Sequence, residues 1–462
     1  MVSAFEPSEL ALGAASASYQ VEGAHDEDGR GVSIWDTFAR RPGAVANGDT
    51  GDVACDSYHR LDDDLALLEG LGVDAYRFSI AWPRVVPDGR GPVSQRGLDY
   101  YDRLVDGLLA QGMVPSPTLY HWDLPQRLED EGGWPSRATA EAFVEYAVAC
   151  RDRLGDRVRL WTTHNEPWCA AYLGYAAGVH APGRRDGEAA HRAAHHLLLS
   201  HAWAATELGP MTDVGLALNL APMWPTSPEA APLADRLDAL RNRVWLGPLA
   251  RGSHDEVTLE VAPVLGDPDL VRDGDLEAIA GSATWLGLNY YTPMRPSVPG
   301  TGSVSPEGAA YPGVPAFDVE VREPVTDIGW EVDERGLEEM LVRMHDETGL
   351  PLVVTENGAA CVDDRVVDGR VDDQDRIDYL QRHLAAVDRA RAAGVDVRAY
   401  FAWTLLDNFE WAEGYDKTFG LVHVDRADPG LPRTPKASYH WFADEARRRR
   451  SQRAGDHGPV TP

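Results

Sequence analysis

The chain has 462 residues, of which 44% are hydrophobic and 25% are charged, as is usual for a globular protein with a large core. Acidic residues outnumber basic ones by 74 to 43, and the formal charge of −31 argues against nucleic acid or another polyanion as a partner. We therefore expect a small, neutral or locally recognised substrate.

Helical and strand patterns alternate along the chain. A run of small residues predicts a first strand at 10–19. Apolar residues at helical spacing predict a helix at 58–71, ended by Gly72, before a second strand at 73–80. The other expected strands are 114–120, 158–163, 214–220, 284–291, 352–355 and 397–404, and expected helices include 98–111, 137–154, 233–246 and 376–393.

Eight strands alternating with helices predict an α/β fold, a single (β/α)8 TIM barrel with long loops at the C-terminal face of the strands. We assign residues 1–446 to this barrel and expect residues 447–462 to form a disordered tail. Residues 296–315, rich in Pro, Gly and Ser, predict a long loop beside the mouth of the barrel.

Four cysteines lie far apart without paired metal-ligand spacing, which predicts reduced thiols and a cytoplasmic location. Residues 1–10 lack the features of a signal peptide, and no apolar stretch of about 18 residues predicts a membrane span. His191 and His195 lie one helical turn apart, a spacing that can bind metal, but no acidic partner sits in the pattern. We expect packed histidines, no metal site and no cofactor.

Two glutamates stand at the ends of predicted strands. Glu166 follows the fourth strand and Glu356 ends the seventh, and a barrel brings such ends together around one mouth. Glycoside hydrolysis uses a pair of carboxyl groups that face each other across the scissile bond. Composition alone leaves the pairing open, since every barrel rim carries acidic residues and a lone strand-end glutamate is more often simply solvated.

Seven short segments decide between a catalytic pair and two solvated glutamates. They occur in the same order as the motifs of one enzyme family, and most of them lie at the ends of predicted strands. They are residues 18–23 (Ser-Tyr-Gln-Val-Glu-Gly), 76–84 (Tyr-Arg-Phe-Ser-Ile-Ala-Trp-Pro-Arg), 121–125 (His-Trp-Asp-Leu-Pro), 163–167 (Thr-His-Asn-Glu-Pro), 289–292 (Asn-Tyr-Tyr-Thr), 355–358 (Thr-Glu-Asn-Gly) and 407–412 (Asp-Asn-Phe-Glu-Trp-Ala). From about residue 11 to residue 441 the sequence resembles the β-glucosidases of glycoside hydrolase family 1.

The resemblance implies a retaining reaction in which Glu166 is the acid/base and Glu356 the nucleophile. Arg77 and Tyr291 match residues that hold the nucleophile, and a cation and a hydroxyl donor both favour its charged form. Asn165 matches the residue that bonds the sugar 2-hydroxyl, an interaction that strengthens in the transition state. Retention requires the two carboxyl groups to lie about 5 to 5.5 Å apart.

The resemblance also implies a sugar site with many hydroxyl partners and an aromatic floor, which Trp403 supplies. A carboxylate at Glu410 would repel a 6-phosphate, so we expect an unphosphorylated sugar. The substrate-binding candidates are Gln20, His121, Trp122, Asn165, Asn289, Tyr291, Trp330, Trp403, Glu410, Trp411 and Phe419.

Two positions depart from the family pattern. Thr418 stands where an arginine commonly precedes Phe-Gly-Leu, and Glu334 replaces the usual proline after the Trp-Glu-Val motif at 330–332. Both departures affect the loop geometry on the leaving-group side. Neither touches an expected catalytic position.

The expected protein is thus a retaining β-glucosidase, monomeric or homo-oligomeric, that acts on β-glycosides or cello-oligosaccharides. A broad β-galactosidase or β-fucosidase, or a transglycosylase, stays open within the same chemistry. A non-catalytic sugar-binding protein would be expected to have lost Glu166 or Glu356. The last alternative is a metal-dependent barrel hydrolase. Activity that survives in excess chelator would exclude it.

Overall fold

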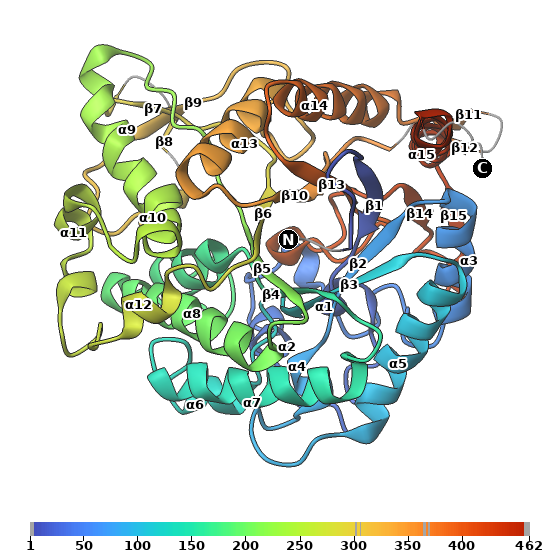
Figure 1. The fold of residues 1–462 in the computed structure, drawn as a ribbon, viewed down its shortest axis with the longest axis horizontal. Helices are drawn as coiled ribbons and strands as arrows, with labels where there is room; N and C mark the ends of the chain where they lie inside the picture. The colour runs from blue at the N-terminus through green and yellow to red at the C-terminus, as the bar shows by residue number, and fades with distance from the viewer. Residues whose placement is uncertain (1–3, 301–302, 305, 364–365, 368–369, 457–462) are drawn as a thin grey trace, which may run out of the picture.

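The computed structural model describes residues 4–300, 303–304, 306–363, 366–367 and 370–456, and its centre is a closed barrel of eight parallel strands (Figure 1). The barrel strands are β1 (Ala11–Ala15), β2 (Ala75–Ser79), β3 (Val114–Tyr120), β4 (Leu160–Asn165), β5 (Asp213–Leu218), β6 (Trp285–Asn289), β10 (Leu352–Asn357) and β13 (Val397–Trp403). The predicted (β/α)8 barrel is confirmed.

Strand β1 closes the barrel by pairing with β13 on one side and β2 on the other. Ala15 is in register with Trp403 and with Arg77, so the side chains of these three strands end at one level. Strand β10 follows β13 around the barrel and pairs with β6, where Glu356 is in register with Asn289. Because all eight strands are parallel, their C-terminal ends form a single mouth.

Helices surround the barrel on its outside (Figure 1). Helix α5 shows how the sequence dictates this layer: Ser94 caps it by accepting from the Gly97 N–H, and its apolar residues form one buried face. The main outer helices are α3 (Leu61–Leu71), α5 (Gln95–Ala110), α7 (Arg137–Leu154), α8 (Gly187–Leu208), α9 (Ala231–Asp238), α10 (Val244–Arg251), α11 (Glu256–Val261), α12 (Asp275–Ile279), α13 (Glu334–Thr348), α14 (Gln374–Ala392) and α15 (Ala437–Asp456).

Short helices occupy the loops. They are α1 (Ser18–Val21), α2 (Ile34–Ala39), α4 (Trp82–Val85) and α6 (Gln126–Asp130), the π-helical segments η2 (Cys169–Ala177) and η4 (Ala239–Arg243), and the 3-10 helices η1 (Ala46–Gly48), η3 (Pro228–Ala230), η5 (Pro263–Gly266), η6 (Pro306–Ala310) and η7 (Trp411–Glu413). The strand expected at 10–19 is therefore shorter than predicted, because the chain turns into α1 after Ala15.

The core has two parts, one inside the barrel and one between the strands and the helices. The inner part packs small side chains of β1 against large ones, including Trp285, Val353 and Phe401. A Cβ added at Gly13 would lie 2.4 Å from the Phe401 ring, so the small-residue run of β1 is required by this packing.

Two expectations about the loops and the C-terminus need correction. Residues 296–315 do not form a plain loop, because β7 (Arg295–Ser297) and β8 (Ser303–Val304) pair antiparallel with β9 (Asp318–Glu320) in a small sheet; residues 301, 302 and 305 lie outside the described residues. Helix α15 continues to Asp456, where we expected disorder from residue 447. Its Arg450 is paired with Asp74 at 2.8 Å; residues 457–462 lie outside the described part.

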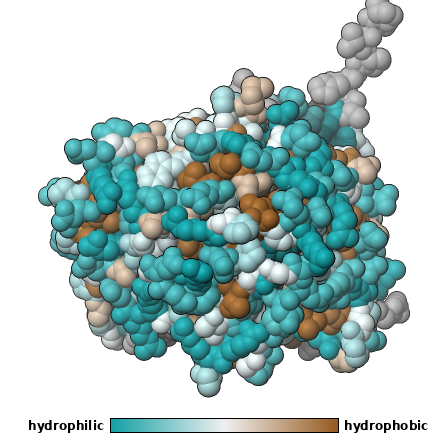
Figure 2. Space-filling view, turned by 90° about the horizontal axis from the view of Figure 1, so that it is seen from below, coloured by the Kyte–Doolittle hydropathy of each residue, from teal (hydrophilic) through white to brown (hydrophobic). Residues whose placement is uncertain are grey.

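Two short hairpins complete the chain: β11 (Val366–Val367) pairs with β12 (Arg370–Val371), and β14 (Val422–Val424) pairs with β15 (Arg433–Pro435). The face seen in Figure 2 is mainly hydrophilic, with hydrophobic residues scattered over it. All four cysteines are free thiols, and three are buried. Among the described helices, none is long and apolar enough to cross a membrane.

Candidate active site

Glu356, near the end of β10, is almost completely buried and is held through both carboxylate oxygens. The Arg77 Nη1 donates to Oε1 at 2.6 Å, and the Tyr291 hydroxyl donates to Oε2 at 2.7 Å. The turn after the strand is tightly packed, since a Cβ at Gly358 would lie 1.9 Å from the Trp403 carbonyl oxygen. Glu356 is thus fixed in one orientation by a cation and a hydroxyl.

Glu166 follows β4 directly and is also buried, but its partners are neutral. The Asn289 Nδ2 donates to Oε1 at 2.8 Å, and the Cys169 thiol donates to Oε2 at 3.2 Å. The backbone of Glu166 has φ of 45°, a left-handed conformation that costs a non-glycine residue energy and is concentrated at functional sites. No hydrogen bond from a cationic side chain to this carboxyl is present among the described residues.

Asn165 connects the surroundings of the two glutamates. Its Oδ1 accepts from the Arg77 Nη2 at 2.6 Å and from the Asn289 Nδ2 at 3.0 Å, and its Nδ2 lies 3.0 Å from the His121 Nε2. Arg77 therefore bonds both Glu356 and Asn165, and Asn289 bonds both Asn165 and Glu166. Residues that are far apart in the sequence form one polar network at the mouth.

The two carboxyl groups have unequal electrostatic surroundings. Burial raises the pKa of Glu356; the charge of Arg77 opposes this rise, the charge of Glu166 reinforces it, and the Tyr291 hydroxyl opposes it. Burial also raises the pKa of Glu166, against the hydrogen bond from Asn289. Repulsion disfavours ionising both carboxyl groups, and the direct hydrogen bond from Arg77 favours the ionised form of Glu356, so we expect the proton that the pair retains to lie on Glu166.

Aromatic rings line the mouth beside this network. The His121 ring stacks on Trp403 with centroids 5.8 Å apart and on Trp411 with centroids 5.9 Å apart, and Trp122 lies 4.4 Å from Trp411. The Trp122 Nε1 donates to the Asn165 carbonyl oxygen at 3.0 Å. Four predicted sugar-site residues, His121, Trp122, Trp403 and Trp411, are thus together.

Gln20 and Glu410 each present a buried oxygen that has no hydrogen-bond partner among the described residues, Oε1 of Gln20 and Oε2 of Glu410. The Gln20 Nε2 donates to the Phe409 carbonyl oxygen at 2.8 Å, which joins α1 to the segment carrying Glu410. Burial, followed by the charges of Glu356 and Glu166, raises the pKa of Glu410 to about 8. Such unpaired buried acceptors are suited to hydroxyl donors of a ligand.

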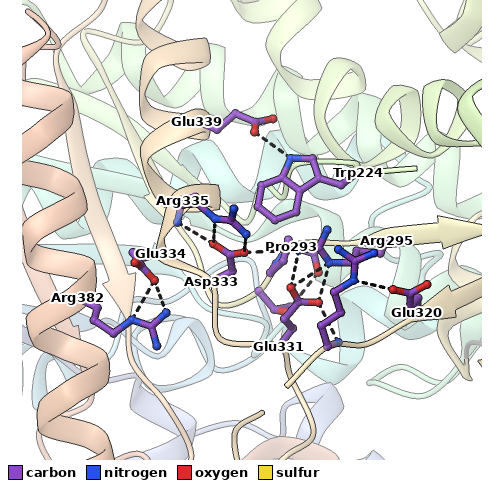
Figure 3. A network of polar contacts seen from close by, with 12 residues as sticks. Trp224, Pro293, Arg295, Glu320, Glu331, Asp333, Glu334, Arg335, Glu339 and Arg382 are labelled. Carbon is purple, nitrogen blue, oxygen red and sulfur yellow. Dashed lines mark hydrogen bonds and ion pairs between the residues drawn. The ribbon is translucent and has the colours of Figure 1, made fainter. Parts of the chain in front are cut away.

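The expected leaving-group side is formed by three rings. Tyr291 lies 5.4 Å from Trp330 and 6.1 Å from Phe419 between ring centroids. The two departures from the family pattern lie nearby and are accommodated: Thr418 donates to the Cys361 carbonyl oxygen at 2.9 Å, and Glu334 starts helix α13 and pairs with Arg382 (Figure 3).

Sequence reasoning missed the neighbours of Glu166. Cys169 lies one helical turn after it, and the Asn219 Nδ2 donates to the Cys169 sulfur at 3.1 Å. Asn219 directly follows β5, so the strand-end rule that found Glu166 could have found it too. Arg241 also went unnoticed; its guanidinium lies 4.0 Å from the Trp168 ring centroid, and its charge lowers the pKa of Glu166 against the effect of burial.

The clustered histidines make contacts within the fold. The His195 Nε2 lies 3.0 Å from Asp275 on α12, an acidic partner that the sequence pattern did not contain, and the His191 Nδ1 lies 3.1 Å from the Tyr172 hydroxyl. Within the described residues, no group of three or more His, Cys, Asp or Glu side chains is placed to hold a metal ion.

Comparison with known proteins decides the family. The model of glycosyl hydrolase family 1 matches residues 3–450. The chain belongs to glycosyl hydrolase family 1. This family 1 glycoside hydrolase is 47% identical over 447 residues to the thermostable β-glucosidase B of Thermobispora bispora, covering 96% of this chain and 90% of that protein.

Two further relatives of the family 1 enzyme bear on its activity. It is 47% identical to a bifunctional β-D-glucosidase/β-D-fucosidase of Bifidobacterium breve, over 94% of this chain and 97% of that one. The solved family 1 β-glucosidase of Thermotoga maritima has a TM-score of 0.89 and 40% identity, covering 96% of this chain and 99% of that one. The family and barrel fold implied by the sequence are therefore confirmed.

Proposed function

We propose that this family 1 enzyme is a retaining β-glucosidase that releases terminal, non-reducing β-D-glucosyl residues, with Glu356 as nucleophile and Glu166 as acid/base. One observation carries the assignment of roles: Glu356 is held by the Arg77 cation, whereas the hydrogen-bond donors to Glu166 are neutral. The first arrangement favours a carboxylate and the second a carboxylic acid.

In the first step a Glu356 oxygen attacks the anomeric carbon while Glu166 gives its proton to the glycosidic oxygen. The carbon–oxygen bond to the leaving group breaks with its electron pair, the leaving group departs as an alcohol, and a covalent glycosyl ester forms on Glu356. Arg77 and Tyr291 keep Glu356 oriented for this attack.

In the second step Glu166 acts as the base. The charge on Glu356 disappears when the ester forms, so Glu166, now ionised, takes a proton from water as the water oxygen attacks the same carbon. Glu356 leaves as a carboxylate, and the two inversions together retain the anomeric configuration. Both carboxyl groups end in their starting protonation states.

The remaining predicted residues bind the sugar. Asn165 is held by Arg77 and Asn289 where it can meet the 2-hydroxyl, and Trp403 supplies an apolar face for the ring. The unpaired oxygens of Gln20 and Glu410 accept hydrogen bonds from other hydroxyls. A 6-phosphate would meet the buried carboxyl of Glu410 without a compensating cation in its motif, so the substrate is an unphosphorylated glycoside or cello-oligosaccharide.

A β-fucosidase activity is the second candidate, since the Bifidobacterium breve relative is named as a glucosidase and fucosidase. Glu410 can accept from an axial or an equatorial 4-hydroxyl, so it does not separate the two sugars by itself. We place the protein in the cytoplasm because its four cysteines, which form no disulfide in the described part of the chain, suit a reducing compartment. Fractionation of the cell of origin tests that location.

The function is tested by hydrolysis of aryl β-glucoside, β-galactoside, β-fucoside, β-xyloside and 6-phospho-β-glucoside, with proton NMR of the first sugar released. We expect the glucoside or fucoside to be cleaved best, the phosphorylated sugar to be refused, and β-anomer to appear before mutarotation. Initial release of α-anomer, or preference for the phosphorylated substrate, would contradict the proposal.

A further inference from the structure

A short hairpin at residues 325–331 carries Trp330 on the expected leaving-group side of the mouth. Val325 and Glu331 form the bridge at its base, and the Thr326 N–H donates to the Trp330 carbonyl oxygen at 2.9 Å. The Trp330 ring lies 5.4 Å from the ring of Tyr291, which donates to Glu356. The position of the hairpin therefore determines where Trp330 stands relative to the reacting centre.

The base of this hairpin is held by a buried ion pair that plays no part in the proposed chemistry. Arg295 donates to Glu331 from Nε, at 3.0 Å to Oε1 and 2.9 Å to Oε2, and from Nη2 at 2.7 Å to Oε1 (Figure 3). Both side chains are below 10% exposed. A two-pronged pair removed from water fixes orientation as well as distance.

Arg295 is itself fixed by the neighbouring loop. Its guanidinium lies 4.6 Å from the ring centroid of Trp224, whose Nε1 donates to Glu339 at 2.9 Å (Figure 3). The backbone N–H of Trp224 donates to the Met294 carbonyl oxygen at 2.8 Å. The loops after β5 and β6 and the hairpin are thus joined through one arginine.

A second anchor holds the turn of the hairpin. Lys417 donates to the Asp327 Oδ2 at 2.9 Å, and the Asp327 N–H donates to the Ala360 carbonyl oxygen at 3.0 Å. Lys417 lies in the segment after β13 and Ala360 in the segment after β10. Trp330 therefore sits between two attachments and has little freedom to adapt to different leaving groups.

We propose that Arg295 is a positioning residue that sets the discrimination among leaving groups, by fixing Trp330 through Glu331 without touching the substrate. The inference rests on the proposed function, since only a glycosidase has a leaving group to discriminate. We expect the Arg295–Glu331 pair to affect leaving-group binding alone, because the pair does not contact the residues that bind the sugar.

The test compares cellobiose, whose leaving group is a second sugar, with an activated aryl β-glucoside. In Arg295→Met we expect the ratio of kcat/KM for cellobiose to kcat/KM for the aryl glucoside to fall about tenfold, mainly through a higher KM for cellobiose. A glucose-like iminosugar inhibitor, which occupies only the sugar side, should keep its inhibition constant within about twofold.

Arg335→Met is the matched control. Arg295 lies 3.5 Å from the Asp333 Oδ2, and Arg335 contacts the same carboxylate. Arg335 lies 5.7 Å from the Trp224 ring centroid, but its side chain is 71% exposed. We expect this variant to keep the wild-type ratio. Lys417→Met, which releases the turn, should lower the ratio in the same direction as Arg295→Met.

Two further variants address folding, because Arg295→Met leaves the Glu331 carboxylate buried without its cation. The double variant Arg295→Met/Glu331→Met removes both charges, and Arg295→Lys keeps a paired cation but loses the two-pronged contact. The test is made with whichever of these variants folds. Each is expected to lower the ratio of kcat/KM for cellobiose to kcat/KM for the aryl glucoside.

Unchanged selectivity in the folded variants, or equal losses on cellobiose, aryl glucoside and inhibitor, would overturn the inference. An inactive wild-type protein would instead refute the proposed function, so the two failures are distinguishable.

Discussion

Arg77 lies 2.6 Å from Glu356, and both side chains are almost entirely removed from water. The same guanidinium donates to Asn165 at 2.6 Å, so one cation orients both the proposed nucleophile and the residue proposed to bind the 2-hydroxyl. Removing the Arg77 guanidinium from water costs free energy, and its hydrogen bonds to Glu356 and Asn165 offset that cost. From this geometry we expect Glu356 to be the member of the carboxyl pair that carries the charge.

Tyr291→Phe is expected to shift the acidic limb of the kcat/KM profile to higher pH. The Tyr291 hydroxyl lowers the pKa of Glu356, so its removal raises that pKa, and Glu356 must be ionised to attack. Losing a hydrogen bond to a charged group should also lower kcat/KM about ten- to a hundredfold. The check is a pH–rate profile of both proteins; a limb that moves to lower pH would contradict the reasoning.

Glu166→Ala is expected to slow substrates with poor leaving groups far more than activated ones. Protonation by a positioned acid contributes about 10²- to 10⁴-fold, and an activated aryl group departs without it. The measurement is kcat/KM, which reports the first step, for cellobiose and for a series of aryl glucosides. Equal losses across the series would show that Glu166 does not protonate the leaving group.

Cys169→Ala is expected to move the alkaline limb to higher pH. The thiol donates to the Glu166 Oε2 at 3.2 Å and so lowers the pKa of Glu166; without it the carboxyl holds its proton to higher pH. Cys169→Ser, which keeps a donor, is the control and should show the smaller shift. An alkaline limb that falls to lower pH in the alanine variant would rule out this role.

The sequence located the residues at strand ends better than the residues that support them. Glu166 and Glu356 could be found because the alternation of strands and helices predicts a barrel, and a barrel brings strand ends together. Cys169 looked like an ordinary buried thiol, and only the local turn of the chain after Glu166 brings it to the carboxyl.

Contacts between distant segments had no sequence signal. Nothing in the pattern around Arg295 pairs it with Glu331, because the sequence predicts a loop where the structure forms the small sheet of β7, β8 and β9. The extent of helix α15 also has no sequence signal: its basic residues predict a solvated tail, whereas Arg450 pairs with Asp74 and Arg453 pairs with Glu9.

Lys436→Met is expected to destabilise the protein strongly. Lys436 is fully buried, its Nζ donates to Asp407 at 2.7 Å, and it also pairs with Asp363. Removing one partner of a buried pair costs about 3 to 5 kcal/mol of unfolding free energy, and here the buried Asp407 carboxylate loses its ammonium partner while Asp363 keeps its ion pair with Arg376.

The other lysine of the chain is the matched control for that prediction. The Lys417 side chain is 23% exposed, so solvent partly screens its ion pair with Asp327, and we expect its loss to cost less stability than the loss of Lys436. Urea denaturation of Lys436→Met and Lys417→Met gives the two free energies. Equal losses would show that the buried cluster around Asp407 is not the support we describe.

The most direct test of the proposed mechanism is to trap the glycosyl-enzyme with an activated 2-deoxy-2-fluoro-β-glucoside and to map the labelled peptide by mass spectrometry. The fluorine weakens the interactions made at the 2-position and slows both steps, while the activated leaving group lets the first proceed. We predict one added fluoroglucosyl group, on Glu356. A label on another residue, or no covalent adduct in an enzyme that still cleaves β-glucosides, would contradict the assignment of Glu356 as nucleophile.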